Sequence, residues 1–155
     1  KKYFLSEIFI ENADFEMMGK IALGKYTRKL PPSQRSLYTQ LIENMVISML
    51  YERLDSSSEN DEYFYSINND KCKIKGSKNI EFLVDGQIDR NDLKLSTIRW
   101  WIVLQDDGSF KVIDISLAGV SLALQKREEF TSYISNNSIS ELIDHLNMKY
   151  NSDDK

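Results

Sequence analysis

Apolar residues in the N-terminal part of the chain recur with the spacing of an amphipathic helix. Residues 3–23 predict two short helical pieces that break near Asn12. Asp14 is placed to cap the second piece, and Gly24 is placed to end it because glycine tolerates a left-handed backbone. This part of the chain is therefore expected to be helical.

The longest helix is predicted over residues 33–54, opened by Pro31 and Pro32. Proline in the first helical turn costs little, because its missing N–H would have no partner there. The apolar stripe of this helix is wide and carries Met45 and Met49, which adapt to irregular partners. Such a stripe is ordinarily core, but it would also suit a disordered acyl chain. The polar residues 55–61 that follow predict a loop.

After this loop the apolar pattern changes from helical to alternating, and it predicts an antiparallel meander of strands. Asp106, Asp107 and Gly108 tolerate the positive φ angles of a tight turn between the last two strands. The four predicted strands cover residues 62–73, 79–89, 96–105 and 109–118. Two helices are predicted to follow, over 121–135 and 138–149, each opened by a serine, Ser121 or Ser138. The second has a capping box with Glu141.

The third predicted strand is apolar on both faces, because Trp100 and Trp101 point in opposite directions. One interpretation is a central strand that is covered on both sides. The other is that one tryptophan lines a cavity while its neighbour packs or meets a partner. The sequence leaves both interpretations open.

Length and composition are those of one folded domain over residues 1–150, with a frayed polar tail over 151–155. Apolar residues make up 41% of the chain and charged residues 28%, and the net charge of −4 disfavours binding to nucleic acid. The first residues are too acidic and too short for a signal peptide, and no apolar run is long enough to span a bilayer.

Candidate chemistry is sparse. The single histidine, His145, lies in a polar helix, and the single cysteine, Cys72, lies among lysines in a predicted edge strand. These counts disfavour histidine-dependent triads, zinc sites and redox pairs. Residues 85–92 are acidic but lack the glycine at the sixth position and the terminal glutamate of a calcium loop. Asp114, inside an apolar strand, is interpreted as structural, paired with Arg28 or Lys111.

Two blocks of the sequence, in the same order, resemble the MlaC or toluene-tolerance family. The early block, LGKYTRKLPPSQR, and the late block, FKVIDISLAGVSLALQKREEF, follow the family patterns LGxYxRxxxPxQR and WKVxDVxxEGVSLxxxxRxEF. The matched residues are Leu23, Gly24, Tyr26, Arg28, Pro32, Gln34 and Arg35, and then Lys111, Val112, Asp114, Gly119, Val120, Ser121, Leu122, Arg127, Glu129 and Phe130. Together the blocks span about three quarters of the chain.

This resemblance implies an α+β fold similar to nuclear transport factor 2, in which a curved four-stranded antiparallel sheet holds helices on its concave face around an apolar lipid cavity. It implies a soluble phospholipid carrier of the periplasm, whose signal peptide is absent from the printed chain, rather than an enzyme. No cofactor is implied other than the phospholipid cargo. The implied partners are an outer-membrane lipoprotein complex and an inner-membrane ABC transporter with its MCE-domain protein. Such transport maintains the lipid asymmetry of the outer membrane.

The expected cavity-lining residues come from the long helix, from three segments of the sheet and from the turn after the last strand. They are Ile42, Met45, Val46, Met49, Leu50, Phe82, Val84, Trp101, Val103, Val120 and Leu122. Two other function classes stay open. One is a module that binds another protein without lipid, and the other is a small isomerase or dehydratase on the same fold.

Overall fold

A computed structural model describes residues 7, 9–54, 63–78, 80–91 and 93–151. The chain divides into two compact units, each assembled from segments that are far apart in sequence. Residues 1–10, 15–55 and 123–155 form the helical unit, and residues 11–14 and 56–122 form the sheet unit. The predicted loop over 55–61 and nearly all of the predicted tail lie outside the described residues.

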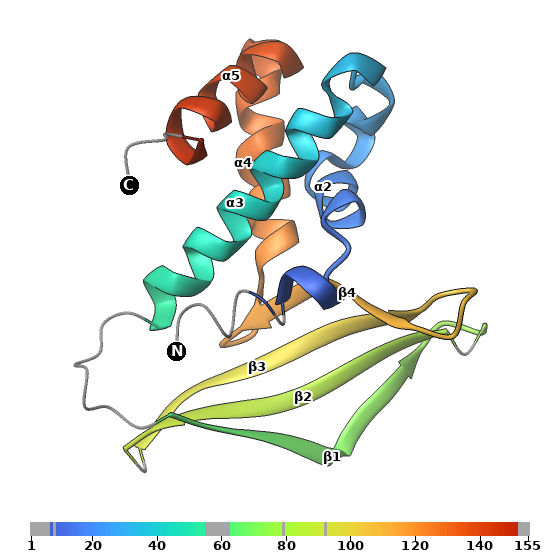
Figure 1. Cartoon of the computed structure of the whole chain (residues 1–155), viewed down its shortest axis with the longest axis vertical. Coiled ribbons are helices and arrows are strands. Elements are labelled where there is room, and N and C mark those ends of the chain that lie inside the picture. The colour runs from blue at the N-terminus through green and yellow to red at the C-terminus, as the bar shows by residue number, and fades with distance from the viewer. Residues whose placement is uncertain (1–6, 8, 55–62, 79, 92, 152–155) are drawn as a thin grey trace. The chain divides into compact units, whose positions relative to one another are not determined.

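The helical unit contains the elements that the helical periods predict (Figure 1). A short helical segment, residues 9–12, ends at Asn12, as predicted, and its last two residues belong to the sheet unit. The helices are α2 (Phe15–Leu23), α3 (Arg35–Leu54), α4 (Leu122–Asn136) and α5 (Ile139–Tyr150), with 3-10 turns at Gly24–Lys29 and Pro32–Gln34. Gly24 follows α2 with a φ of 54°, so the chain changes direction there.

Buried side chains and a few hydrogen bonds join the helices of this unit. Gly19 of α2 lies against the ring of Tyr38 on α3, and the Tyr38 hydroxyl donates to the Gly19 carbonyl at 2.8 Å. Arg127 of α4 donates from Nε to the Ile21 carbonyl at 2.7 Å. The capping box that the sequence predicts for α5 is confirmed: the Ser138 side chain accepts from the Glu141 N–H at 3.1 Å.

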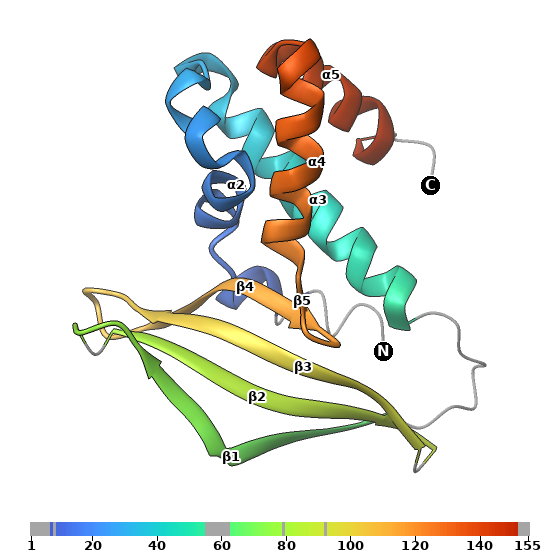
Figure 2. The same ribbon diagram turned by 180° about the vertical axis from the view of Figure 1, so that it is seen from behind.

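The sheet unit is an antiparallel meander in the order β1-β2-β3-β4-β5 (Figure 2). Its strands are β1 (Tyr63–Lys75), β2 (Glu81–Arg90), β3 (Leu93–Leu104), β4 (Phe110–Leu117) and β5 (Val120–Ser121). The prediction of an α+β fold with an antiparallel sheet is confirmed, but the prediction of four strands is wrong because β5 adds another. A two-residue strand is too short to produce an alternating pattern in the sequence.

Turns at both ends of β4 set the path of the chain. Gly108 has a φ of 85°, which confirms the tight turn predicted at residues 106–108. Ala118 and Gly119 have φ angles of 50° and 84°, and this left-handed pair reverses the chain so that β5 pairs with the end of β4. The same edge of β4, opposite β3, is also engaged nearer the start of the strand, because the Asp14 N–H donates to the Val112 carbonyl at 2.9 Å.

Three register shifts interrupt the ladders of the sheet. One lies between Ile67 and Cys72 of β1, one between Ile88 and Asp89 of β2, and one between Trp101 and Ile102 of β3. At each shift one strand has extra residues and bulges. Beyond the bulge, odd-numbered and even-numbered positions of that strand exchange faces relative to the partner strand.

β1 is an edge strand, as predicted, and Cys72 and Lys73 are exposed on it.

Candidate functional site

The strand register separates the side chains of the sheet into two sets, because directly opposed residues of an antiparallel pair lie on the same face. One set is almost entirely apolar, and we name it the apolar face. It comprises Tyr65, Ile67, Cys72, Ile74, Phe82, Val84, Gly86, Ile88, Arg90, Leu93, Ser96, Ile98, Trp100, Ile102, Leu104, Phe110, Val112, Ile115, Leu117 and Val120, and its polar members other than the aromatic ones are Cys72, Arg90 and Ser96. A sheet that faced water with these residues would be costly unless a ligand or a further surface covered them.

The opposite set, which we name the polar face, carries charged side chains that interact with one another. Arg99 forms two bonds to the Asp85 carboxylate, at 2.6 and 2.9 Å. The Trp101 indole N–H donates to Glu81 at 3.2 Å, and the Lys75 ammonium lies 3.3 Å from the centre of the Trp101 ring. The tryptophan of this face is thus held by charged partners, an arrangement suited to contact with water.

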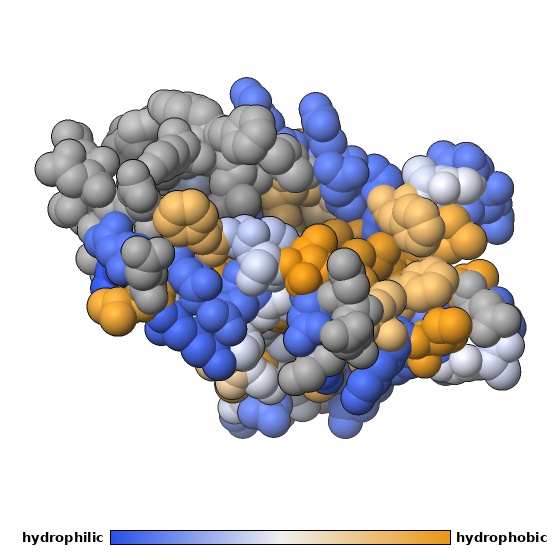
Figure 3. Space-filling view, turned by 90° about the horizontal axis from the view of Figure 1, so that it is seen from below, coloured by the Kyte–Doolittle hydropathy of each residue, from blue (hydrophilic) through white to orange (hydrophobic). Residues whose placement is uncertain are grey.

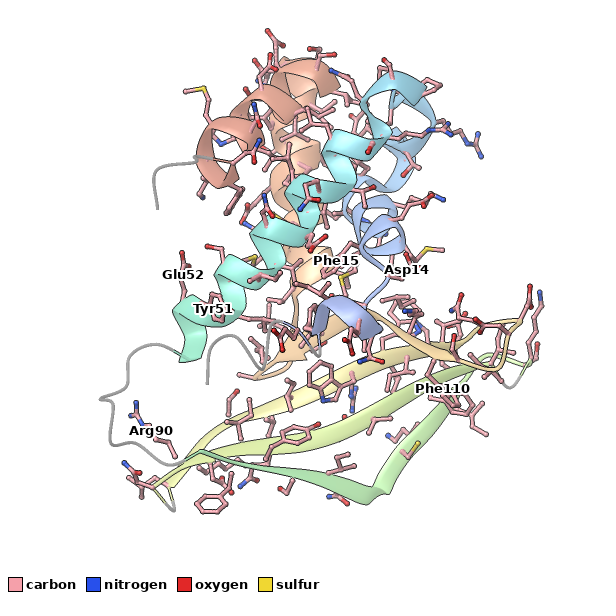
Figure 4. All side chains as sticks on the ribbon, in the orientation of Figure 1. Asp14, Phe15, Tyr51, Glu52, Arg90 and Phe110 are labelled. Atoms are coloured by element: carbon pink, nitrogen blue, oxygen red, sulfur yellow. The ribbon has the colours of Figure 1, made fainter. Side chains whose placement is uncertain are left out.

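Several members of the apolar face are substantially exposed. Ile67, Ile74 and Phe110 expose 54%, 58% and 53% of their surfaces. Phe110 starts β4 and is labelled in Figure 4, and its ring packs edge-on against Phe82 with the ring centroids 6.0 Å apart. Figure 3, a view of the molecule from below, shows apolar side chains gathered side by side. Contiguous exposed apolar surface of this kind is typical of binding sites for apolar ligands or partners.

One polar pair interrupts the apolar face. The Trp100 indole N–H donates to the Tyr65 hydroxyl, and the two rings meet edge to face with their centroids 6.3 Å apart. Gly86 lies beneath the pair: a Cβ atom there would be 2.9 Å from the Tyr65 hydroxyl oxygen and 2.7 Å from the Ser66 carbonyl oxygen. Only a residue without a side chain lets β1 approach β2 so closely.

The predicted sheet residues do not all share a face. Phe82 and Val84 belong to the apolar face, whereas Val103 lies opposite Glu81 and Trp101 lies opposite Leu83, on the polar face. These four residues therefore do not share one face of the sheet, and their contact with lipid stays a prediction. The alternating period of a strand shows which residues share a face but not which face binds.

Two further residues that were expected to line the cavity, Val120 and Leu122, follow the turn after β4. Val120 lies opposite Leu117, on the apolar face, and is 50% exposed, so it is available to a ligand. Leu122 begins α4 and is buried, with 5% of its surface exposed.

The helical candidates all lie on α3, where Ile42, Met45, Val46 and Leu50 are buried and Met49 is partly exposed. This burial agrees with the core interpretation of the wide stripe. Their contact with lipid stays a prediction.

Sequence reasoning missed Tyr65 and Gly86. A signal for Gly86 was present, because an isolated glycine inside a strand pattern indicates a bulge or a close backbone approach. Tyr65 carried no comparable signal, since its distance from Trp100 depends on how β1 pairs with β2.

The described residues offer little catalytic chemistry. Asp114 is buried and accepts a hydrogen bond from the Ser121 hydroxyl, while the Lys111 ammonium donates to the Glu11 carbonyl at 2.6 Å. His145 is exposed and stacks on Tyr133, with the ring centroids 5.4 Å apart. Within the described part of the chain, no group of histidine, cysteine or acidic side chains could hold a metal ion. Over the same residues, no helix is long and apolar enough to cross a membrane.

Comparisons with known proteins agree with this geometry. The family model of the MlaC protein matches residues 1–148. Among solved structures, the chain is similar to the phospholipid-binding protein from Ralstonia solanacearum, solved in complex with a phospholipid, with a TM-score of 0.71 and 17% sequence identity. That match covers 93% of this chain and 78% of the other, and at this identity it establishes the fold. No curated protein matches the chain at the significance required.

Proposed function

The chain belongs to the MlaC family, and we propose that it is a phospholipid carrier whose apolar face contacts the acyl chains of its cargo. Within this proposal the protein works in the periplasm and passes phospholipid between an outer-membrane lipoprotein complex and an inner-membrane ABC transporter with its MCE-domain protein. Its fold would then be a variant of the nuclear transport factor 2 type, and the whole of residues 1–150 would act as one lipid-binding domain.

The observation that supports this proposal is the contrast between the two faces of the sheet. The polar face is occupied by paired charges such as Arg99 and Asp85, so it is stable in water. The apolar face offers aliphatic and aromatic side chains from four neighbouring strands, with large residues such as Ile67 and Phe110 more than half exposed. Acyl chains are ligands of matching chemistry.

The energetics favour a carrier with such a surface. A phospholipid has about thirty acyl methylenes, and transfer of each from water to an apolar surface is worth about 0.8 kcal/mol, or about 24 kcal/mol in all. A protein that recovers most of this free energy can exchange lipid with a membrane at little net cost. The reaction makes or breaks no covalent bond, so the proposal requires no catalytic residue.

A matched pair of substitutions on β2 tests the assignment of the apolar face. Val84 lies on the apolar face, opposite Trp100, and its neighbour Leu83 lies on the polar face, opposite Lys73. Val84→Asp places a short carboxylate against the acyl chains, which costs about 3 kcal/mol or more and lowers affinity about 100-fold or more. Leu83→Asp introduces the same carboxylate beside a lysine, and we expect it to retain lipid.

The measurement is uptake of labelled phosphatidylcholine from vesicles, with lipid per protein determined after the vesicles are removed, and thermal melting to show that both variants fold. Equal uptake by the two variants would contradict the face assignment. A wild-type protein that takes up no phospholipid, and that carries none in native mass spectrometry, would instead refute the carrier proposal. That result would favour a module that binds another protein through this face.

A further inference from the structure

The Tyr65–Trp100 pair places hydrogen-bonding groups in the middle of the apolar face. Tyr65 lies opposite Ile88, and Trp100 lies between Val84 on one neighbouring strand and Ile115 on the other. These neighbours are aliphatic, so the pair places polar groups among hydrocarbon side chains. A buried or half-buried polar group of this kind usually fixes the orientation of a ligand.

The position of Tyr65 depends on Gly86. The ring carbon Cε2 of Tyr65 is 3.2 Å from the place that a Cβ of residue 86 would occupy, and the hydroxyl oxygen is 2.9 Å from it. The glycine therefore lets the tyrosine ring lie flat over β2 and reach the indole of Trp100 on β3. The register shift of β1 begins just beyond, after Ile67.

The chemistry of the pair fixes the direction of its hydrogen bond. An indole N–H can only donate, so the Tyr65 oxygen is the acceptor, and the hydroxyl hydrogen is left for a different acceptor. Burial raises the pKa of Tyr65, so the hydroxyl keeps its hydrogen at neutral pH. Accepting the bond from Trp100 also polarises the hydroxyl and makes it a better donor.

We propose that the Tyr65 hydroxyl donates a hydrogen bond to an ester carbonyl oxygen of the bound lipid, so that the protein prefers ester-linked to ether-linked lipids. Trp100 acts as a positioning residue that holds the hydroxyl in place. This inference rests on the proposed function and adds the linkage that the site recognises.

The ester carbonyl is the acceptor that fits this position. It joins directly to the acyl chain, so it reaches a donor embedded among aliphatic side chains while the chain covers the surface around it. A phosphate is an anion and binds best to cationic donors. Of the basic side chains on the central strands, Arg99 on β3 and Lys111 on β4 lie on the polar face. Arg90 lies on the apolar face but at the end of β2, opposite Leu93, whereas Trp100 lies opposite Val84.

The test compares a diacyl phosphatidylethanolamine with its dialkyl ether analogue, which has the same headgroup and chain length. Affinities are measured by competition with a labelled lipid for the wild-type protein, for Tyr65→Phe and for the control Tyr133→Phe. The control removes a hydroxyl from α4 in the helical unit, where it lies 3.5 Å from the Glu141 carbonyl.

We expect the wild-type protein and Tyr133→Phe to bind the ester lipid about two- to tenfold more tightly than the ether lipid, the usual worth of one neutral hydrogen bond. Tyr65→Phe should bind both lipids with the affinity that the wild-type protein has for the ether. If Tyr65 had a purely structural role, Tyr65→Phe would lower the affinity for both lipids equally. Trp100→Phe retains an aromatic ring but not the N–H, and it should reduce the same preference; this variant serves if Tyr65→Phe does not fold.

Equal binding of the two lipids by the wild-type protein would overturn the inference and leave the carrier proposal intact. An equal loss for both lipids in Tyr65→Phe would also overturn it, because a phosphate acceptor or a packing role predicts that result. Failure of the wild-type protein to bind either lipid would refute the carrier proposal itself.

Discussion

Gly86→Ala tests the close approach of β1 to β2 beneath the Tyr65–Trp100 pair. The added Cβ would lie 2.7 Å from the Ser66 carbonyl oxygen, 2.9 Å from the Tyr65 hydroxyl oxygen and 3.2 Å from Tyr65 Cε2. The first of these atoms belongs to the backbone and cannot rotate away. The strand itself must move, or the tyrosine must leave its position.

Two opposing contributions decide the sign of the stability change. Alanine is favoured over glycine inside a strand by about 0.5–1 kcal/mol, because it loses less backbone entropy. Overpacking of this kind costs about 1–3 kcal/mol, and displacement of Tyr65 loses a hydrogen bond worth about 1 kcal/mol more. We therefore expect Gly86→Ala to lower the free energy of unfolding by about 1–3 kcal/mol.

Urea unfolding followed by tryptophan fluorescence measures this change. The chain has two tryptophans, and both lie on β3, so their emission follows the sheet unit. With a slope of about 2 kcal/mol/M, the midpoint should fall by about 0.5–1.5 M with little change in slope. The same variant should lose the preference for ester-linked lipid, because Tyr65 can no longer hold its position.

Tyr65→Ala provides the control for Gly86→Ala. In the Tyr65→Ala background the contacts with the tyrosine are absent, but the contact with the Ser66 carbonyl persists. Gly86→Ala should therefore lower the free energy of unfolding by less than it does in the wild type, but still lower it. A Gly86→Ala protein as stable as the wild type, or more stable, would refute the close approach.

Three further predictions concern single side chains. Burial raises the pKa of Tyr38 above its ordinary value of 10.0, so the neutral phenol stabilises the fold below about pH 10 and this contribution falls as pH rises further. Unfolding followed by circular dichroism at increasing pH should show a larger loss of stability in the wild type than in Tyr38→Phe, and equal losses would contradict this role of Tyr38. Ser121→Ala should lower the free energy of unfolding by about 1–2 kcal/mol in urea, because it removes a donor to the buried Asp114 carboxylate, and an equal cost in an Asp114→Ala background would exclude this pairing. Val120→Glu should abolish phosphatidylcholine uptake without lowering the melting temperature, since Val120 is 50% exposed; normal uptake would show that this residue does not contact lipid.

The sequence determined the local elements of this protein. The period of 3.6 over residues 33–54 located α3, because a buried helix must place its apolar residues on one stripe. Ser138 and Glu141 located the start of α5, because capping depends on residues three apart in the chain. The blocks around Gly24 and Gly119 also identified the family, because each is a run of matched residues at fixed spacing along the chain.

Only the tertiary structure decided which side chains meet. Trp100 and Trp101 are equivalent in the sequence, and the pairing of β2 with β3 places the first on the apolar face and the second beside Glu81 and Lys75. A bulge of one residue reverses parity along a strand pair, so the composition of each face cannot be read by counting along the chain.

The same reason explains why Tyr65, Gly86 and the partner of Asp114 were not predicted. Tyr65 and Trp100 are 35 residues apart in the chain. Their hydrogen bond forms only because β1 pairs closely with β2 at Gly86, in one particular register. Asp114 accepts from Ser121 because the turn through Gly119 brings β5 back beside β4. Periodicity fixes what is local to a helix or strand, whereas the polar contacts of the site depend on distances between strands that only the folded chain sets.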